Sequence, residues 1–120
     1  MKVIVRISKS FKRQAKPLLR KYSSLRRELF VLEKVLIENP KLGKPLGLNA
    51  YKIRLSVKSK KKGKSGGLRI ITHLETEIIG IIKDEGGITV VTLLSIYDKG
   101  ETDVITDKEL KDLISRLLIE

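Results

Sequence analysis

The chain has 120 residues, no cysteine and one histidine, and its 26 lysine and arginine residues against 14 aspartate and glutamate residues give a net charge of +12. This length predicts a single domain over residues 1–120 with one hydrophobic core. The missing cysteines exclude a disulfide framework and thiolate metal ligands, and a lone histidine excludes a histidine cluster. We therefore expect no metal and no cofactor, and a reducing, cytoplasmic setting is consistent with the composition.

The positive charge is concentrated in the first part of the chain. Residues 1–74 carry 21 basic and 3 acidic side chains, whereas residues 75–120 carry 5 and 11. A surface formed by the first part attracts polyanions, and nucleic acid is the first candidate. A membrane surface is the weaker interpretation, because the chain has no tryptophan anchor and no apolar run long enough to span a bilayer.

The first 40 residues predict a strand followed by two helices. Residues 2–8 alternate apolar and polar side chains, which is typical of a half-buried strand. From about Ser10, apolar residues recur at helical spacing, and a second helical pattern starts at Leu25 and ends before Pro40. Because only two serines separate these patterns, we expect two short antiparallel helices.

Three strands are predicted in the following part of the chain. Residues 51–58 alternate strictly between apolar and polar side chains, so one face of this strand is apolar and the other is basic. Residues 68–83 and 88–99 are rich in β-branched side chains and flank the turn signal DEGG, which indicates a long hairpin.

The last predicted element is a helix in which Thr106 and Glu109 have the spacing of a capping box. The order β-α-α-β-β-β-α predicts a small α+β domain with a mainly antiparallel sheet, two N-terminal helices on one face and a C-terminal helix. We expect the opposite sheet face to be open. The apolar strand residues expected against the helices are Tyr51, Ile53, Leu55, Val57, Ile88, Val90, Thr92, Leu94 and Ile96.

Residues 58–72, KSKKKGKSGGLRIIT, contain a GKS core similar to that of a nucleotide-binding loop. Such a loop needs a glycine five positions before the Gly of GK, where this chain has Lys58. The stretch also leads into a predicted strand at Leu68, so no helix N-terminus faces a phosphate. A nucleotide-binding loop is therefore excluded, and for the charge run alone a solvated loop that serves solubility is the simpler alternative.

The neighbours of this basic stretch favour a functional site. With regular alternation, four cationic side chains and one phenol share the open sheet face. They are Lys52, Arg54, Arg69, Tyr97 and Lys99. Attack of a ribose 2'-hydroxyl on its own phosphodiester needs cations at the phosphorane, a proton acceptor and a proton donor, and it requires neither metal nor histidine. These residues therefore predict RNA binding and cleavage.

The segment KIRLSVKSKKKGKSGGLRIIT, followed by TLLSIYDKGE and a capped helix, resembles the RelE/ParE superfamily of toxins from type II toxin-antitoxin systems. It is most similar to the RelE/HigB-like branch, and the likeness covers nearly the whole chain. The resemblance implies a microbial-RNase-like (RelE-like) fold and an mRNA interferase, a metal-independent endoribonuclease that inhibits translation by cutting mRNA in the ribosomal A site. The implied partners are a cognate antitoxin protein, the ribosome and mRNA, with no membrane partner.

The resemblance also implies roles for individual residues. Arg69 matches the strand arginine that contacts the scissile phosphate, and Lys99 falls near a second catalytic cation. Arg54 and Tyr97 complete the catalytic candidates, Tyr97 because no tyrosine follows Lys99, where RelE has a catalytic one. The lysines expected to contact RNA and the ribosome are Lys52, Lys58, Lys60, Lys61, Lys62 and Lys64.

Two alternative functions are compatible with much of this pattern. One is a ParE-like inhibitor of DNA gyrase, and the other is a non-catalytic RNA-binding or ribosome-binding module. The combination of Arg69 with Lys99 argues against the gyrase inhibitor. We interpret His73, the single histidine, as structural and Asp98 as a turn residue that braces the strand end.

Overall fold

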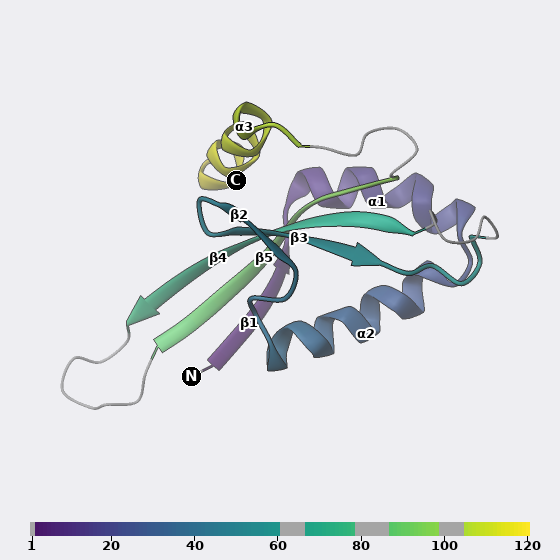
Figure 1. Ribbon diagram of the computed structural model, residues 1–120, viewed down its shortest axis with the longest axis horizontal. Helices are drawn as coiled ribbons and strands as arrows, with labels where there is room; N and C mark the ends of the chain where they lie inside the picture. The colour runs from purple at the N-terminus through teal and green to yellow at the C-terminus, as the bar shows by residue number, and fades with distance from the viewer. Residues whose placement is uncertain (1, 61–66, 79–86, 99–104) are drawn as a thin grey trace.

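The computed structural model describes residues 2–60, 67–78, 87–98 and 105–120 (Figure 1). The elements in chain order are β1 (Lys2–Ile7), α1 (Lys9–Lys21), α2 (Leu25–Glu38), β2 (Lys44–Gly47), β3 (Ala50–Leu55), β4 (Leu68–Ile78), β5 (Gly87–Asp98) and α3 (Asp107–Leu118). The predicted α+β class and its order of elements are confirmed, with the short strand β2 as an addition. No helix among the described residues is long and apolar enough to cross a membrane.

The five strands form one sheet in the order β1-β5-β4-β3-β2. The pairs β5–β4, β4–β3 and β3–β2 are antiparallel, whereas β1 runs parallel to β5 at the edge of the sheet. A parallel pair needs a crossover connection, and here α1, α2 and the strands that follow provide it. The prediction of a mainly antiparallel sheet is therefore confirmed, and the sequence-adjacent strands β4 and β5 form its centre (Figure 1).

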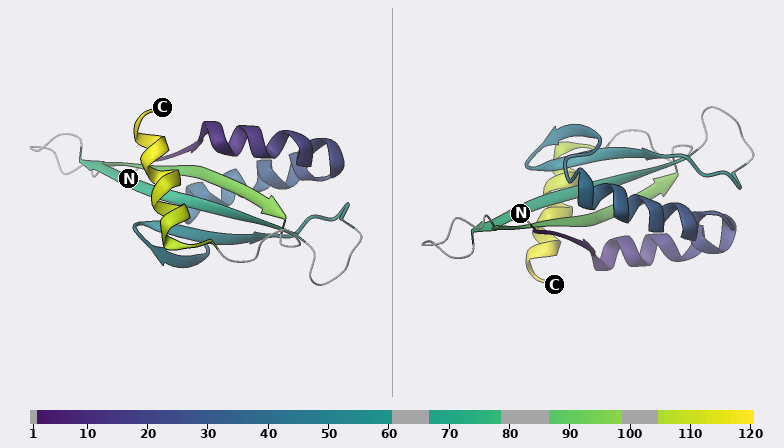
Figure 2. Two further views of the ribbon diagram at one scale, coloured as in Figure 1. Left: turned by 90° about the horizontal axis from the view of Figure 1, so that it is seen from above. Right: turned by 90° about the horizontal axis from the view of Figure 1, so that it is seen from below.

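Helices α1 and α2 cover one face of the sheet (Figure 2). Ser8 caps α1, because its hydroxyl accepts a hydrogen bond from the Phe11 amide at 3.0 Å and donates one to the Leu94 carbonyl at 3.1 Å. The cap thus attaches the start of α1 to β5. The buried residues of this larger core include Phe11, Ala15, Leu25, Leu32, Leu36, Ile53, Leu68, Ile70, Val91, Leu93 and Ile96.

The second face of the sheet is not open, contrary to the prediction. Helix α3 lies across it, on the side opposite α1 and α2 (Figure 2). Leu110 of α3 packs with Ile71 and Leu94 in a second core cluster in which all three side chains are almost fully buried. The physical reason is that the apolar stripe of α3 needs a partner surface, and these strand residues provide it.

A β-bulge in β5 reverses the predicted faces of this strand. Ile71 pairs with Ser95 but Thr72 pairs with Leu93, so Leu94 is an extra residue opposite β4. Strict alternation therefore breaks at Leu94. Val91 and Leu93 join Ile96 in the core under α1 and α2, while Leu94 faces α3.

The predicted apolar face of β5 was consequently wrong for the residues that precede Ser95. Side chains alternate with a period of two, so one inserted residue moves every residue on one side of it to the other face. Ile88, Val90, Thr92 and Leu94 do not share a face with Ile96. The predictions for Tyr97 and Asp98 are unaffected, because both follow the bulge.

Candidate functional site

Three predicted site residues lie side by side on three adjacent strands. Arg54 of β3 pairs with Arg69 of β4, and Arg69 pairs with Tyr97 of β5. Directly opposed residues of antiparallel strands project to the same face, with Cβ atoms about 4.5–5.5 Å apart. The sheet therefore places two guanidinium groups and a phenol in one row on the face that α3 partly covers.

The neighbouring row of the same face contains Lys52, Ile71 and Ser95. Lys52 is half-buried and lies two residues from the exposed Arg54 on β3. Ile71 contributes to the core under α3. Lys52 thus adds a third cation beside Arg54 and Arg69, as the alternation of this strand predicts.

Arg69 is an arginine buried in the middle of the sheet. Only 3% of the residue is exposed, and its Nε atom has no hydrogen-bond partner within the described part of the chain. The same residues provide no carboxylate within ion-pair distance of it. Burying an arginine without a counter-charge destabilises the folded state by several kcal/mol. Removal of one partner of a buried ion pair, which leaves such a charge behind, costs about 3–5 kcal/mol of folding stability. An anion at this position would compensate that cost.

The end of β5 is held by Asp98, which accepts hydrogen bonds from two distant segments. Its Oδ2 atom accepts from the Tyr22 hydroxyl at 3.0 Å, and its Oδ1 atom lies 2.7 Å from Lys60 Nζ. The side chains of Lys60 and Asp98 are 12% and 14% exposed, so this ion pair is largely buried. We call Tyr22, Lys60 and Asp98 the Asp98 clamp.

Lys60 therefore has a structural contact in addition to its predicted role in RNA binding. Its ammonium group also donates to the Gly67 carbonyl at 3.2 Å. Gly67 has a φ of +93°, and a Cβ atom there would lie 2.5 Å from the Leu55 carbonyl oxygen, so only glycine fits. Lys60 consequently joins Gly67, which lies two residues before Arg69, to the Asp98 clamp.

The segment that follows β3 is attached to the junction of α1 and α2. Ser24 and Ser59 exchange hydrogen bonds, with 2.8 Å between their hydroxyl oxygens and 2.9 Å from the Ser59 amide to the Ser24 hydroxyl. The Lys58 amide donates to Glu28 Oε2 at 2.8 Å. Lys58 thus has a fixed backbone and an exposed side chain, which suits contact with a polyanion.

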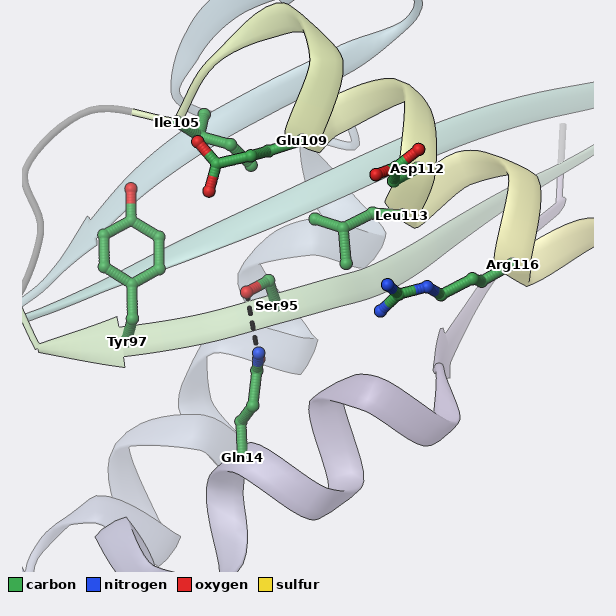
Figure 3. A pocket seen from close by; sticks show the side chains of 8 residues that line it. All are labelled: Gln14, Ser95, Tyr97, Ile105, Glu109, Asp112, Leu113 and Arg116. Atoms are coloured by element: carbon green, nitrogen blue, oxygen red, sulfur yellow. Dashed lines mark hydrogen bonds between the residues drawn. The ribbon is translucent and has the colours of Figure 1, made fainter.

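A pocket of about 260 Å³ opens between α3, β5 and α1, directly beside this row (Figure 3). Its lining residues are Gln14, Ser95, Tyr97, Ile105, Glu109, Asp112, Leu113 and Arg116. Gln14 Oε1 accepts hydrogen bonds from the Ser95 hydroxyl at 2.9 Å and from the Ile96 amide at 3.0 Å, which fixes this wall. Tyr97 therefore belongs both to the arginine row and to the pocket.

The α3 wall of the pocket carries two carboxylates, Glu109 and Asp112, and one guanidinium group, Arg116. Glu109 completes the predicted capping box, which is confirmed, because its Oε1 accepts from the Thr106 amide and its own amide donates to the Thr106 hydroxyl. These hydrogen bonds, the one from the Thr106 backbone foremost, hold the pKa of Glu109 below its ordinary value. Glu109 thus remains ionised at neutral pH, one turn from Asp112.

His73 is on the same sheet face as Arg69 but four residues along β4. It is buried, and burial lowers its pKa while nearby Glu75 opposes that shift. Its Nδ1 atom lies 3.9 Å from Glu75 Oε1 and has no hydrogen-bond partner among the described residues. A buried, neutral imidazole is consistent with the structural interpretation and adds no cation to the site.

Several predicted site residues lie outside the described residues. These are Lys61, Lys62, Lys64 and Lys99. Among the residues that are described, no group of histidine, cysteine or acidic side chains could hold a metal ion.

Sequence reasoning missed the pocket walls and the Asp98 clamp. Asp112 follows Glu109 by three residues, so both lie on one side of α3, and this spacing was a usable signal. Gln14 carried no signal, because an isolated glutamine on an amphipathic helix has no distinctive spacing. Asp98 was expected to brace a strand end, but its partners could not be read from neighbouring positions.

Comparison with known proteins shows a similarity in fold. No family model and no curated protein matches the sequence. Among solved structures, a mutant of the E. coli toxin RelE in the free state has a similar fold, with a TM-score of 0.50 and 19% sequence identity. The alignment covers 98% of this chain and 96% of the RelE chain. The similarity thus rests on the arrangement of the strands and helices more than on shared residues. The chain has the fold of the RelE toxin.

Proposed function

We propose that this protein is the toxin of a type II toxin-antitoxin system and acts as an endoribonuclease that cuts mRNA on the ribosome. The observation that carries the proposal is Arg69, a buried guanidinium without a counter-charge among the described residues, in register with Arg54 and Tyr97. A phosphodiester supplies the anion that this row lacks. The RelE-like fold supports the same activity.

In the proposed reaction, the 2'-oxygen of a ribose forms a bond to the adjacent phosphorus and the bond from phosphorus to the 5'-oxygen breaks. The 2'-hydroxyl loses a proton and the leaving oxygen gains one. Arg69 and Arg54 stabilise the extra negative charge of the phosphorane, since arginine donates to two phosphate oxygens at once. The Tyr97 hydroxyl exchanges a proton with the reacting oxygens, and Lys99 provides a further cation.

The exposed lysines extend this site toward a larger polyanion. Lys52 adjoins the arginine row, and Lys58 projects from the fixed segment after β3. Lys61, Lys62 and Lys64 belong to the same basic stretch of sequence. We propose that these lysines bind the backbone of mRNA and ribosomal RNA, a contribution that weakens as salt concentration rises.

The first test is mRNA cleavage mapped by primer extension in a purified translation system, with and without ribosomes. Arg69→Ala should reduce cleavage about 100-fold or more, because it removes a preorganised charge from the transition state. Arg69→Lys should restore little activity, since lysine lacks the two-pronged donor geometry. Tyr97→Phe should slow cleavage while leaving the cut positions unchanged.

Arg20→Ala is the matched control, because Arg20 is exposed in the last turn of α1, and α1 lies on the sheet face opposite α3. It should cleave like the unmodified protein. Full activity of Arg69→Lys would identify a site that needs only positive charge, which is the property of an RNA-binding module. Absence of cuts with the unmodified protein would overturn the proposed nuclease.

The proposed antitoxin partner fits an apolar groove on the other side of the sheet. The groove has a volume of about 570 Å³ and lies between β1, α1 and α2. Ile7 and Phe30 are each 53% exposed in its wall. Its charged lining residues are Arg6, Lys12, Lys16, Arg26 and Glu33. An apolar floor with a mainly basic rim fits an acidic, amphipathic segment of the antitoxin.

A further inference from the structure

Lys60 differs from Lys58, two positions earlier in the basic stretch, because its ammonium group is bound inside the fold. The group lies 2.7 Å from Asp98 Oδ1 and donates to the Gly67 carbonyl at 3.2 Å. Only 12% of the Lys60 side chain is exposed, whereas Lys58 is an exposed residue. The Asp98 carboxylate neutralises Lys60 at close range, so Lys60 adds little to the field that attracts a polyanion.

The two contacts of Lys60 join the ends of β4 and β5 beside the arginine row. Arg69 and Tyr97 pair directly across these two strands. Asp98 follows Tyr97 on β5, and Gly67 lies two residues before Arg69. Strand ends open more readily than strand centres, so a contact that joins them here limits the movement of the neighbouring pair.

Tyr97 is fixed through the residues on both of its sides. The amide of Ile96, which precedes it, donates to Gln14 Oε1 at 3.0 Å. The carboxylate of Asp98, which follows it, accepts from the Tyr22 hydroxyl at 3.0 Å. Gln14 belongs to α1 and Tyr22 is its C-cap, so both contacts attach this part of β5 to the same helix. The position of the Tyr97 phenol therefore depends on the contacts that hold Asp98.

We propose that Lys60 is a positioning residue that keeps Tyr97 in place beside Arg69 and does not itself bind RNA. The proposal rests on the proposed nuclease activity and assigns this lysine to the geometry of the site instead of its affinity for RNA. Proton transfer requires heavy atoms within about 2.6–3.2 Å of each other. A displacement of about 1 Å can lower the rate about 100-fold. An ion pair next to Tyr97 thus affects the rate of cutting without touching the RNA.

The alternative roles of Lys60 predict different measurements. A lysine that binds a phosphate releases counterions, so its loss makes the affinity for RNA less sensitive to salt. A lysine that positions Tyr97 leaves this salt dependence unchanged, but its loss lowers the rate of cleavage at saturating substrate. A lysine that only stabilises the fold changes neither quantity when both are measured on folded protein.

The first assay compares the RNA binding of Lys60→Met and Lys58→Met. Fluorescence anisotropy measures the affinity for a labelled 2'-O-methyl oligonucleotide, which cannot be cut, over a series of salt concentrations. Lys58→Met should reduce the slope of log affinity against log salt by about 0.7, the value for one phosphate contact of a single strand. Lys60→Met should leave the slope unchanged.

The second assay measures the kcat and KM of mRNA cleavage over a series of concentrations of ribosomes carrying mRNA. Lys60→Met should lower kcat about 10-fold or more with little change in KM, because Tyr97 is displaced while the RNA contacts remain. Circular dichroism confirms that each variant is folded. Tyr22→Phe removes one hydrogen bond from Asp98 and keeps Lys60, so it tests the same positioning in a milder variant. It should lower kcat about 5-fold at an unchanged salt slope.

The two assays separate failure of this proposal from failure of the proposed function. A smaller salt slope for Lys60→Met would identify Lys60 as an RNA-binding residue and overturn its positioning role. Unchanged kcat in each variant that folds would also overturn that role and leave the proposed nuclease intact. Absence of cleavage by the unmodified protein would overturn both.

Discussion

Arg69 and His73 are both buried on the same face of β4, but burial has different consequences for the two side chains. The guanidinium group of arginine is effectively always charged in proteins, so the burial of Arg69 is compensated by an anion. Histidine can release its proton and become neutral, and burial lowers the pKa of His73 accordingly. In the proposed function, Arg69 and not the lone histidine is therefore the residue assigned to the phosphate.

This difference predicts how stability depends on pH. Because the pKa of His73 is lower in the folded protein than in the unfolded chain, the unfolded chain binds more protons as the pH falls below about 6.5. The contribution of His73 to stability is thus complete above that pH and is lost as the pH decreases. Urea unfolding at pH 7.5 and pH 5.5 should show a smaller loss of stability for His73→Gln than for the unmodified protein. Equal losses would contradict a buried, neutral histidine.

At the scale of elements, the Asp98 clamp connects the end of β5 with α1 and with the segment between β3 and β4. Lys60 and Asp98 are mostly buried, so removal of one partner takes the ion-pair contact from a charge that is shielded from water. We expect Asp98→Asn or Lys60→Met to lower the free energy of unfolding by about 3 kcal/mol. Tyr22→Phe, which removes only one hydrogen bond, should cost about 1 kcal/mol.

A double-mutant cycle measured by urea unfolding tests this clamp. The variant that combines Asp98→Asn with Lys60→Met should lose less stability than the two single variants together, because each single change already removes the ion pair between the two residues. Ser59 and Lys60 are adjacent, so Ser59→Ala combined with Asp98→Asn provides a control outside the ion pair. Additive losses for Asp98 and Lys60 would show that the contact does not couple them.

At the scale of the whole molecule, the two sheet faces have different proposed partners. The face partly covered by α3 carries the arginine row and the pocket, and the opposite side presents the apolar groove between β1, α1 and α2. The proposed mRNA and antitoxin sites are therefore separate. An antitoxin bound in the groove would inhibit mRNA cleavage through the sheet that both sites share, or through further contacts that it makes with the protein.

The groove leads to a prediction for antitoxin binding. Phe30→Ala and Ile7→Ala remove exposed apolar side chains from its wall and should each weaken the complex with the cognate antitoxin about 10-fold, as expected for central interface residues. Isothermal titration calorimetry measures this change. Ile119→Ala, which changes an exposed residue outside the groove, should bind normally. Unchanged affinity in both groove variants would place the antitoxin elsewhere.

The sequence alone determined the features that depend on neighbouring residues. Alternation along β3 placed Lys52 and Arg54 on one face, helical spacing located α1 and α2, and the Thr106 capping box marked the start of α3. These patterns are readable because they arise from the local geometry of strands and helices, within a few positions.

Only the tertiary structure decided the features that join distant segments. Asp98 meets Lys60 across 38 positions and Tyr22 across 76, and no local pattern encodes such partners. The bulge at Leu94 changed the faces of β5, and the packing of α3 on the second sheet face created the pocket beside Tyr97. The site is thus assembled by packing and register, which depend on the whole chain at once, while its individual strand residues could be recognised from local alternation.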